Sequence, residues 1–276
     1  MRCILLFTLC FISTLLNAQQ ATLKNPDYLD HVDLSYYLDH KGIRTPIDSK
    51  DDWLTRRQHV LASMQKVMGA FPQPDSPVEL KMQVHEEVRN AKVTRQLISY
   101  HTDSDARRIR AYLFLPTQNK KTRPAVLCLH QTIGIGKKEP AGLGGNPQLH
   151  YALHLAERGF VTLAPDYPSF GDYSYAFPLE DGYVSGTMKA IYENTRAVDL
   201  LQTLRQVDSE RIGCIGHSLG GHNTIFTAAF DTRIKAMVSN CGFTRFHKYY
   251  EGKLKGWTSA RSVSYTHLTL PTNREV

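Results

Sequence analysis

The sequence predicts an α/β fold: a mostly parallel sheet with helices on both faces, opened by antiparallel strands. Three observations lead to it. Between residues 124 and 239, short apolar runs alternate with amphipathic stretches of helical period. Between residues 78 and 115, shorter segments alternate polar and apolar residues. A Gly-x-Ser-x-Gly turn from Gly216 to Gly220 joins an apolar run to a helical stretch.

Each element follows from one of these patterns. The antiparallel strands are expected at residues 78–88, 92–100 and 108–115. The parallel strands are expected at residues 124–130, 160–164, 212–215 and 234–239, with helices at 149–158, 184–205 and 223–230. The order strand, helix, strand implies crossovers between parallel neighbours.

One helix is expected before the sheet. Ser49 is a candidate N-cap, Asp52 stands three residues on, and Gly69 and Pro72 end the apolar helical spacing. We expect this amphipathic helix to pack on the main domain, and partner binding is the alternative.

Composition is ordinary for a globular protein. The 276 residues are 42% hydrophobic and 21% charged, which allows one large α/β domain with an extension. The net charge of +7 does not indicate nucleic-acid binding, because the basic stretch between Lys81 and Arg123 lacks interleaved aromatic residues and any recognisable module. We interpret that stretch as solvated strand faces.

Residues 1–18 have the pattern of a signal peptide. Arg2 precedes the apolar run from Cys3 to Leu16, and Ala18 offers a small residue at a cleavage point. A bilayer span needs about 20 apolar residues, so no membrane span is predicted. The mature protein is expected to be secreted or periplasmic.

The remaining cysteines indicate neither disulfide nor metal site. Cys128, Cys214 and Cys241 lie in or at the end of apolar strands without paired spacing, and buried free thiols are expected. No cluster has metal-ligand spacing.

No cofactor is predicted either. The glycine-rich segment 134–147 fails the phosphate-loop pattern at Gln131 and Lys138, and the dinucleotide pattern at Pro147. It is better interpreted as lining the reactive site.

Ser218 is the candidate nucleophile. Glycine on both sides of the turn lets a serine hold a strained backbone at the carboxyl end of a strand. The following helix would place free N–H groups and a positive dipole beside it. The alternative is an ordinary N-cap serine in a glycine-rich turn.

Several motifs together resemble the α/β-hydrolase superfamily. They are the strand ending in His130, the segment from Ala164 to Pro168, the lead-in from Val207 to Gly213, and the nucleophile turn. Within the superfamily, residues 105 to 260 are most similar to dienelactone-hydrolase-like and prolyl-oligopeptidase-like secreted esterases.

The resemblance implies an acyl-enzyme on Ser218 and two backbone donors for the oxyanion. One donor is the N–H of Leu219. The other belongs to the loop after His130, where relatives carry His-Gly-x: the N–H of Thr132 is expected, with Gln131 second.

The acid and base of the resemblance have no obvious counterpart. In the superfamily they follow two further strands, and only one strand follows the turn here. His222 is expected to pack inside and His247 comes too early. Asp231 and Glu251 are interpreted as surface carboxylates.

Three polar residues near the turn have structural interpretations. His130 and His217 are expected to be structural neighbours of the site rather than bases. Asp166, at a strand end, is expected to hydrogen-bond nearby backbone, with a catalytic role as the alternative.

Residues 262–276 continue no earlier pattern and are interpreted as a non-native read-through tail, which leaves His267 without a role. The acid and base are then expected beyond residue 261, and the chain is expected to be an inactive fragment with its last strands missing. The predicted organisation is a signal peptide (1–18), an N-terminal extension (19–104), an incomplete hydrolase domain (105–261) and the tail (262–276).

The predicted function is a serine hydrolase of the carboxylesterase class (EC 3.1.1) that acts on a small-molecule ester without a cofactor. Two alternatives stay open. One is an S9-like serine peptidase, which the lack of an N-terminal propeller domain disfavours. The other is a non-catalytic binding protein of the same fold.

Overall fold

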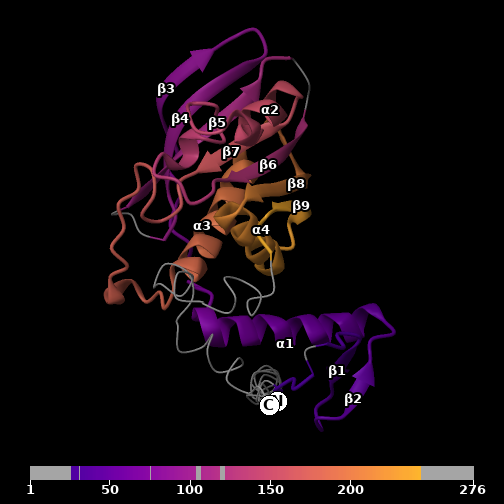
Figure 1. Ribbon diagram of the computed structural model, residues 1–276. Coiled ribbons are helices and arrows are strands. Elements are labelled where there is room, and N and C mark those ends of the chain that lie inside the picture. The colour runs from indigo at the N-terminus through magenta and orange to yellow at the C-terminus, as the bar shows by residue number, and fades with distance from the viewer. Residues whose placement is uncertain (1–25, 31, 75, 104–106, 119–121, 244–276) are drawn as a thin grey trace, which may run out of the picture. The chain divides into compact units, whose positions relative to one another are not determined.

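The computed structural model describes residues 26–30, 32–74, 76–103, 107–118 and 122–243 (Figure 1). The chain divides into two compact units, one up to Met64 and one from Gln65 on. The predicted signal peptide and tail lie outside the described residues, as do His247, Glu251 and His267. The predicted domain boundaries therefore stay predictions.

The first unit contains a short hairpin and most of one helix. β1 (Tyr36–Leu38) pairs antiparallel with β2 (Arg44–Pro46). α1 (Lys50–Met68) begins where the capping pattern predicts, because the N–H of Asp52 donates to Ser49 Oγ at 3.2 Å and the N–H of Ser49 donates to Asp52 Oδ2 at 2.9 Å. The helix ends before Gly69, whose φ is 95°.

The second unit is built on a seven-stranded sheet in the order β3-β4-β5-β7-β6-β8-β9 (Figure 1). β3 to β5 pair antiparallel, and β5 pairs antiparallel with β7. β7, β6, β8 and β9 run parallel. Their bounds are β3 (Gln83–Arg89), β4 (Val93–His101), β5 (Arg108–Pro116), β6 (Arg123–Leu129), β7 (Val161–Pro165), β8 (Val207–His217) and β9 (Ile234–Asn240). The predicted mostly parallel sheet with antiparallel opening strands is confirmed.

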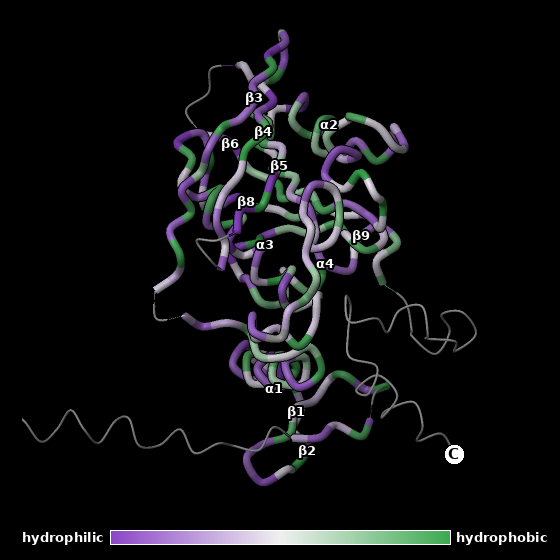
Figure 2. Tube along the Cα trace, turned by 90° about the vertical axis from the view of Figure 1, so that its left-hand side faces the viewer, coloured by the Kyte–Doolittle hydropathy of each residue, from purple (hydrophilic) through white to green (hydrophobic). Residues whose placement is uncertain are grey.

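Helices cover both faces of this sheet, as the alternation of core residues shows. Leu127 and Leu163 pack in one apolar cluster with residues of α3 (Gly186–Thr203). Their neighbours Cys128 and Ala164 pack in a second cluster with residues of α2 (Tyr151–Glu157). Successive strand residues point to opposite faces, so the two clusters lie on opposite sides. In Figure 2, β3 at the outer end of the sheet is largely hydrophilic, in agreement with its exposed residues.

The strand bounds differ from the prediction where pairing extends a strand. β8 begins at Val207, five residues before the apolar run, because Val207 pairs with Arg123 of β6 across an irregular register. β3 begins only at Gln83, where its pairing with Ser99 of β4 starts. In the part of the chain that the structure describes, no helix is both long and apolar enough to cross a bilayer.

The sheet brings three segments to one edge. The carboxyl ends of β6, β7 and β8 lie side by side because these strands are parallel neighbours. The loop of residues 130–150 follows β6, the loop of residues 166–185 follows β7, and the serine turn follows β8. Sites in open parallel sheets form at this edge.

α3 carries a buried charged cluster. Lys189 is 0% exposed, and its Nζ lies 2.5 Å from Asp103 Oδ2 and 2.8 Å from Glu193 Oε1. The hydroxyl of Tyr173 donates to the same Glu193 oxygen at 2.6 Å. Burial raises the pKa of Glu193 to about 6, while the nearby Lys189 ammonium opposes the rise.

We expect Lys189→Met to lower the free energy of unfolding by about 3–5 kcal/mol, because it leaves two carboxylates buried without their cation. Urea denaturation at pH 7 measures the change. The matched control is Lys235→Met, an exposed lysine on β9 that should shift the value by less than about 0.5 kcal/mol. Equal losses in both variants would contradict the role of the buried cluster.

Candidate active site

Ser218 stands on a strained turn between β8 and α4 (Leu219–Phe230). Its φ of 52° and ψ of −114° lie outside the regions that a non-glycine residue ordinarily adopts. Hydrogen bonds on both sides hold it: the N–H of Ser218 donates to Asn240 O at 2.8 Å, and its carbonyl accepts from the N–H of His222 at 2.9 Å. The turn therefore has the backbone geometry expected of a nucleophile.

The flanking glycines are required by close backbone packing. A Cβ on Gly216 would lie 2.3 Å from the carbonyl carbon of Gly220. A Cβ on Gly220 would lie 2.0 Å from Leu129 O and 2.8 Å from His130 O. Neither position can take a side chain without moving backbone. The second contact also shows that the serine turn adjoins the start of the loop after β6.

Two further glycines were not singled out from the sequence. A Cβ on Gly221 would lie 2.8 Å from Asn240 O, and one on Gly242 would lie 2.2 Å from the carbonyl carbon of Gly221. The serine turn therefore packs against the segment after β9 as well as against β6. The doubled glycine after Leu219 was the available signal, but its partner at residue 242 lies 21 residues away in the chain.

The start of α4 offers backbone donors beside Ser218. Leu219 is the first helical residue, and no side chain caps the helix at Ser218. The first N–H groups of an α-helix have no acceptor within the helix, and the dipole makes this end positive. The geometry suits the predicted donor at Leu219. The roles of Leu219, Thr132 and Gln131 in an oxyanion hole stay predictions.

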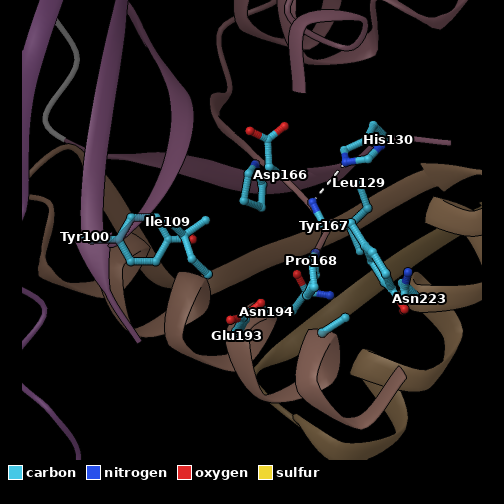
Figure 3. Close-up of a pocket in the computed structure, with 12 residues that line it drawn as sticks. Tyr100, Ile109, Leu129, His130, Asp166, Tyr167, Pro168, Glu193, Asn194 and Asn223 are labelled. Carbon is cyan, nitrogen blue, oxygen red and sulfur yellow. Dashed lines mark hydrogen bonds between the residues drawn. The ribbon is translucent and has the colours of Figure 1, made fainter. Parts of the chain in front are cut away.

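His130 begins the loop after β6 with both ring nitrogens engaged. Its Nε2 accepts from the N–H of Tyr167 at 2.9 Å, a bond drawn in Figure 3, and its Nδ1 lies 2.6 Å from Gln131 O. These partners require a neutral ring with the proton on Nδ1. Burial also lowers the pKa of His130. The ring ties two loops together and has no free nitrogen to act as a base.

Gln131 and Thr132 follow in different environments. Gln131 is half-buried, and its Nε2 donates to Glu139 Oε1 at 3.1 Å and to Oε2 at 2.9 Å. Thr132 is exposed. The side chain after His130 is thus fixed, while the next residue faces solvent.

Asp166 is buried at the end of β7 and has the structural role that the sequence indicated. Its Oδ1 accepts from the N–H of Lys137 at 2.8 Å, and its Oδ2 accepts from the N–H of Asp172 at 3.0 Å. The Lys137 ammonium lies 2.6 Å from Oδ2. Both carboxylate oxygens are engaged by these groups, and neither is hydrogen-bonded to a histidine among the described residues.

His222 lies inside, as expected from the sequence. It is 4% exposed on α4, and its ring packs edge-on against Phe226 with centroids 4.2 Å apart. Burial lowers the pKa of His222 to about 4. The ring is neutral at pH 7. His217, the residue before the serine, is half-buried.

Asp231 contradicts its prediction as a surface carboxylate. It is 6% exposed at the end of α4. Its oxygens accept from Arg233 Nε at 2.9 Å and Nη2 at 2.7 Å, which supplies the countercharge that burial requires. Glu251, interpreted in the same way, lies outside the described residues.

The cysteine prediction is wrong at one of three positions. Cys128 and Cys214 are buried free thiols, and burial raises the pKa of Cys214 to about 12. Cys241 is free but exposed, because it follows β9, which lies at the edge of the described sheet. None of the three is paired.

A small cavity lies between the loop after β7 and the helices α3 and α4 (Figure 3). Its volume of about 10 Å³ is near the minimum for one water molecule, so it is not a substrate pocket. His130 and Tyr167 line it on the loop side, and Glu193, Asn194 and Asn223 line it on the helix side.

These features define an α/β-hydrolase fold. A strained serine lies between a strand and a helix at the carboxyl edge of the sheet, and the sheet has the observed strand order and helices on both faces. Residues 109–256 match the dienelactone hydrolase family. The chain belongs to that family, which confirms the resemblance seen in the sequence.

Several proteins resemble parts of this chain. YtaP of Bacillus subtilis (strain 168), which is named as a hydrolase, is 33% identical over half of this chain and 49% of its own length. The quorum-quenching protein AidA of Acinetobacter baumannii (strain MDR-ZJ06) is 29% identical over 51% of this chain and 42% of its own. The chain thus spans about half or less of the length of these relatives.

Among solved structures, a glucuronoyl esterase from Solibacter usitatus aligns with a TM-score of 0.53 and 20% identity, over 72% of this chain and 60% of that one. A Bacteroides fragilis protein described as an acetyl xylan esterase aligns with a TM-score of 0.55 and 21% identity, over 68% of this chain and 53% of that one. At these identities the likeness shows the fold.

Because His222 is buried, the free energy of unfolding should decrease as the pH falls. Its pKa is about 4 in the folded chain and 6.5 ordinarily, so only the unfolded chain binds the proton between these values. The contribution of the neutral, buried His222 to the free energy of unfolding is therefore complete above pH 6.5. It falls by about 3 kcal/mol as the pH drops toward 4.

We expect His222→Asn to lose less stability than the parent chain between pH 7 and pH 4, as measured by urea unfolding across that range. The matched control is His154→Asn, a half-buried histidine of α2. Parallel stability curves for the parent and His222→Asn would show that His222 does not titrate as its burial implies.

Proposed function

We propose that this chain carries the nucleophile and oxyanion donors of a serine esterase that cleaves small carboxylic esters. Ser218 Oγ loses its proton and attacks the ester carbonyl carbon, and the bond to the alcohol oxygen breaks as that oxygen takes up the proton. Water then hydrolyses the acyl-enzyme, which releases the acid and returns a proton to Ser218 Oγ. The N–H of Leu219 and an N–H of the loop after His130, from Thr132 or Gln131, stabilise the tetrahedral oxyanion.

The strained turn at Ser218 is the observation that carries this proposal. A non-glycine residue with φ of 52° and ψ of −114° costs about 1–3 kcal/mol and persists where its surroundings impose it. Four glycines and a hydrogen bond to Asn240 O impose it here. An ordinary N-cap serine needs no such strain, because its side chain accepts from the first turn of the helix, which Ser218 does not do.

The ester substrate class rests on the family and on the fold. The match to the dienelactone hydrolase family supports a hydrolase. The two solved structures reported above are named as esterases, which favours an ester over an amide bond. No particular acyl or alcohol group follows from these likenesses.

The general base and its acid are proposed to lie outside the described residues. His130 has both nitrogens engaged, His222 is buried, and Asp166 is held by Lys137. As in the sequence interpretation, we place the base and acid beyond residue 261. This chain alone should then show little turnover, because catalysis without the base is only about 10³- to 10⁴-fold over water.

A fluorophosphonate probe tests the nucleophile. We expect labelling of the full-length gene product at Ser218, no labelling of Ser218→Ala, and unchanged labelling of Ser209→Ala, an exposed serine of β8 that serves as the matched control. Mass spectrometry of the labelled peptide identifies the site.

Each contrary result favours a different alternative. Absence of labelling in the full-length product favours the non-catalytic binding protein. Labelling together with cleavage of peptide substrates, but not of nitrophenyl esters, favours the serine peptidase. Ester turnover by the 276-residue chain at ordinary enzyme rates, about 10 per second, would show that its base lies within this sequence.

We further propose that the protein is exported and works in the periplasm or outside the cell. The support is the apolar run from Cys3 to Leu16 followed by Ala18. Expression in a bacterial host followed by fractionation should give a periplasmic or secreted product that begins at Gln19. A cytoplasmic product that retains Met1 would contradict export.

A further inference from the structure

A fully buried ion pair joins the loop after β6 to the loop after β7. Lys137 Nζ lies 2.6 Å from Asp166 Oδ2 and 2.6 Å from Asp172 Oδ2. The side chains of Lys137 and Asp166 are 0% exposed, and that of Asp172 is 34% exposed. A lysine so enclosed has no access to a substrate, so its effect must pass through the loops that it connects.

The backbones of both loops close around the same carboxylate. The N–H of Lys137 and the N–H of Asp172 donate to opposite oxygens of Asp166, at 2.8 Å and 3.0 Å. Gly136 and Gly171, with φ of 53° and 57°, approach so closely that a Cβ on either would lie 2.2 or 2.1 Å from Asp166 Oδ1. The position of each loop is therefore set by one side chain at the end of β7.

A second buried carboxylate, that of Glu139, is bonded to the start of the loop after β6. Glu139 is 2% exposed and accepts from Gln131 Nε2 with both oxygens. Its Oε1 also accepts from the N–H of Asn146 at 3.0 Å. The segment of residues 131–139 is thus held at its start by the bond from Gln131 to Glu139 and near its end by the bonds from Lys137 to Asp166.

A buried ion pair contributes weakly to stability, because the cost of removing two charges from water offsets their attraction. Replacement by neutral residues of similar volume is often tolerated. What the pair supplies is a defined geometry. That geometry is imposed on the segment that carries Gln131 and Thr132, which follows Leu129 and His130, the residues whose carbonyl oxygens lie close to Gly220 of the serine turn.

We propose that Lys137 and Asp166 are positioning residues of the acyl site, whose ion pair sets the direction of the loop amide that completes the oxyanion hole. Glu139 supports the same loop through Gln131. This inference rests on the proposed function of Ser218. The oxyanion exists only after attack on the carbonyl, so the pair affects the rate of the chemical step and leaves ground-state binding unchanged.

The test needs a variant that lacks the Lys137–Asp166 ion pair but keeps no fully buried charge without a partner. The double variant Lys137→Met with Asp166→Asn removes the charges of Lys137 and Asp166 at nearly constant volume. It should fold, because Asp172 is 34% exposed and the introduced asparagine keeps one carbonyl oxygen to accept a loop N–H. The single variant Lys137→Met leaves the buried Asp166 without its cation and should lower the free energy of unfolding more than the double variant does. Lys138→Met is the matched control, since Lys138 lies in the same loop without a side-chain ion pair to the described residues.

The first measurement is amide hydrogen exchange, which needs no catalytic activity. In the double variant, we expect exchange in residues 131–139 to quicken at least about tenfold, while α4 keeps its protection. Unchanged exchange in residues 131–139 would overturn the proposal. So would a uniform rise across α4 and the sheet, which would assign the pair to general stability.

The second measurement is the concentration dependence of fluorophosphonate labelling in the full-length product. We expect the limiting rate to fall about 10- to 100-fold in the double variant with an unchanged half-saturating concentration, because a displacement near 1 Å costs up to about 100-fold. Lys138→Met should match the parent protein. An unchanged limiting rate, or a change confined to the half-saturating concentration, would overturn the proposal.

The two measurements also separate this inference from the proposed function. If the parent protein takes up no label, the serine esterase fails and the positioning role in catalysis fails with it. Hydrogen exchange then still decides whether the ion pair holds the loop. If the parent is labelled and the double variant behaves like it, only the positioning role fails.

Discussion

The candidate site at the carboxyl edge of the sheet depends on one close approach between backbones, that of Gly220 to the end of β6. A Cβ at residue 220 would lie 2.0 Å from Leu129 O, a distance at which no side chain fits. Because α4 begins there, this contact sets how near the helix N-terminus comes to the loop after β6. A side chain at Gly220 would move the helix away and separate Leu219 from Gln131 and Thr132, whatever became of Ser218.

The same turn is held from its other side by the segment after β9. Gly221 packs against Gly242, and the N–H of Ser218 donates to Asn240 O. The strain at Ser218, about 1–3 kcal/mol, is therefore offset by contacts to two different strands. The fold and the site cannot be separated here, because the serine keeps its conformation only while β6, β8 and β9 keep their register.

Much of this arrangement could be predicted from the sequence, because it follows from local patterns. The period of the apolar runs indicated the strands and helices, and the glycine-flanked serine indicated the turn. What the sequence does not indicate concerns partners distant in the chain or surroundings that only the sheet defines. Lys137 in a glycine-rich loop gives no sign of burial, since its carboxylate partners stand 29 and 35 residues further on. Asp231 is buried although its cation, Arg233, is only two residues away, and Cys241 is exposed because β9 lies at the edge of the described sheet.

The charges around Ser218 show which part of the chemistry the described residues support. His130 is neutral through its hydrogen bonds, and burial keeps His222 neutral at pH 7. Asp166 is compensated by Lys137. These groups are neutral or paired, whereas the backbone N–H groups at the start of α4 and the dipole of that helix place positive potential at the turn. Such a field stabilises negative charge that develops on a substrate oxygen, but it does not accept the proton of the serine. On the function proposed above, the described residues supply the backbone donors for the oxyanion, and the proposed base lies outside them.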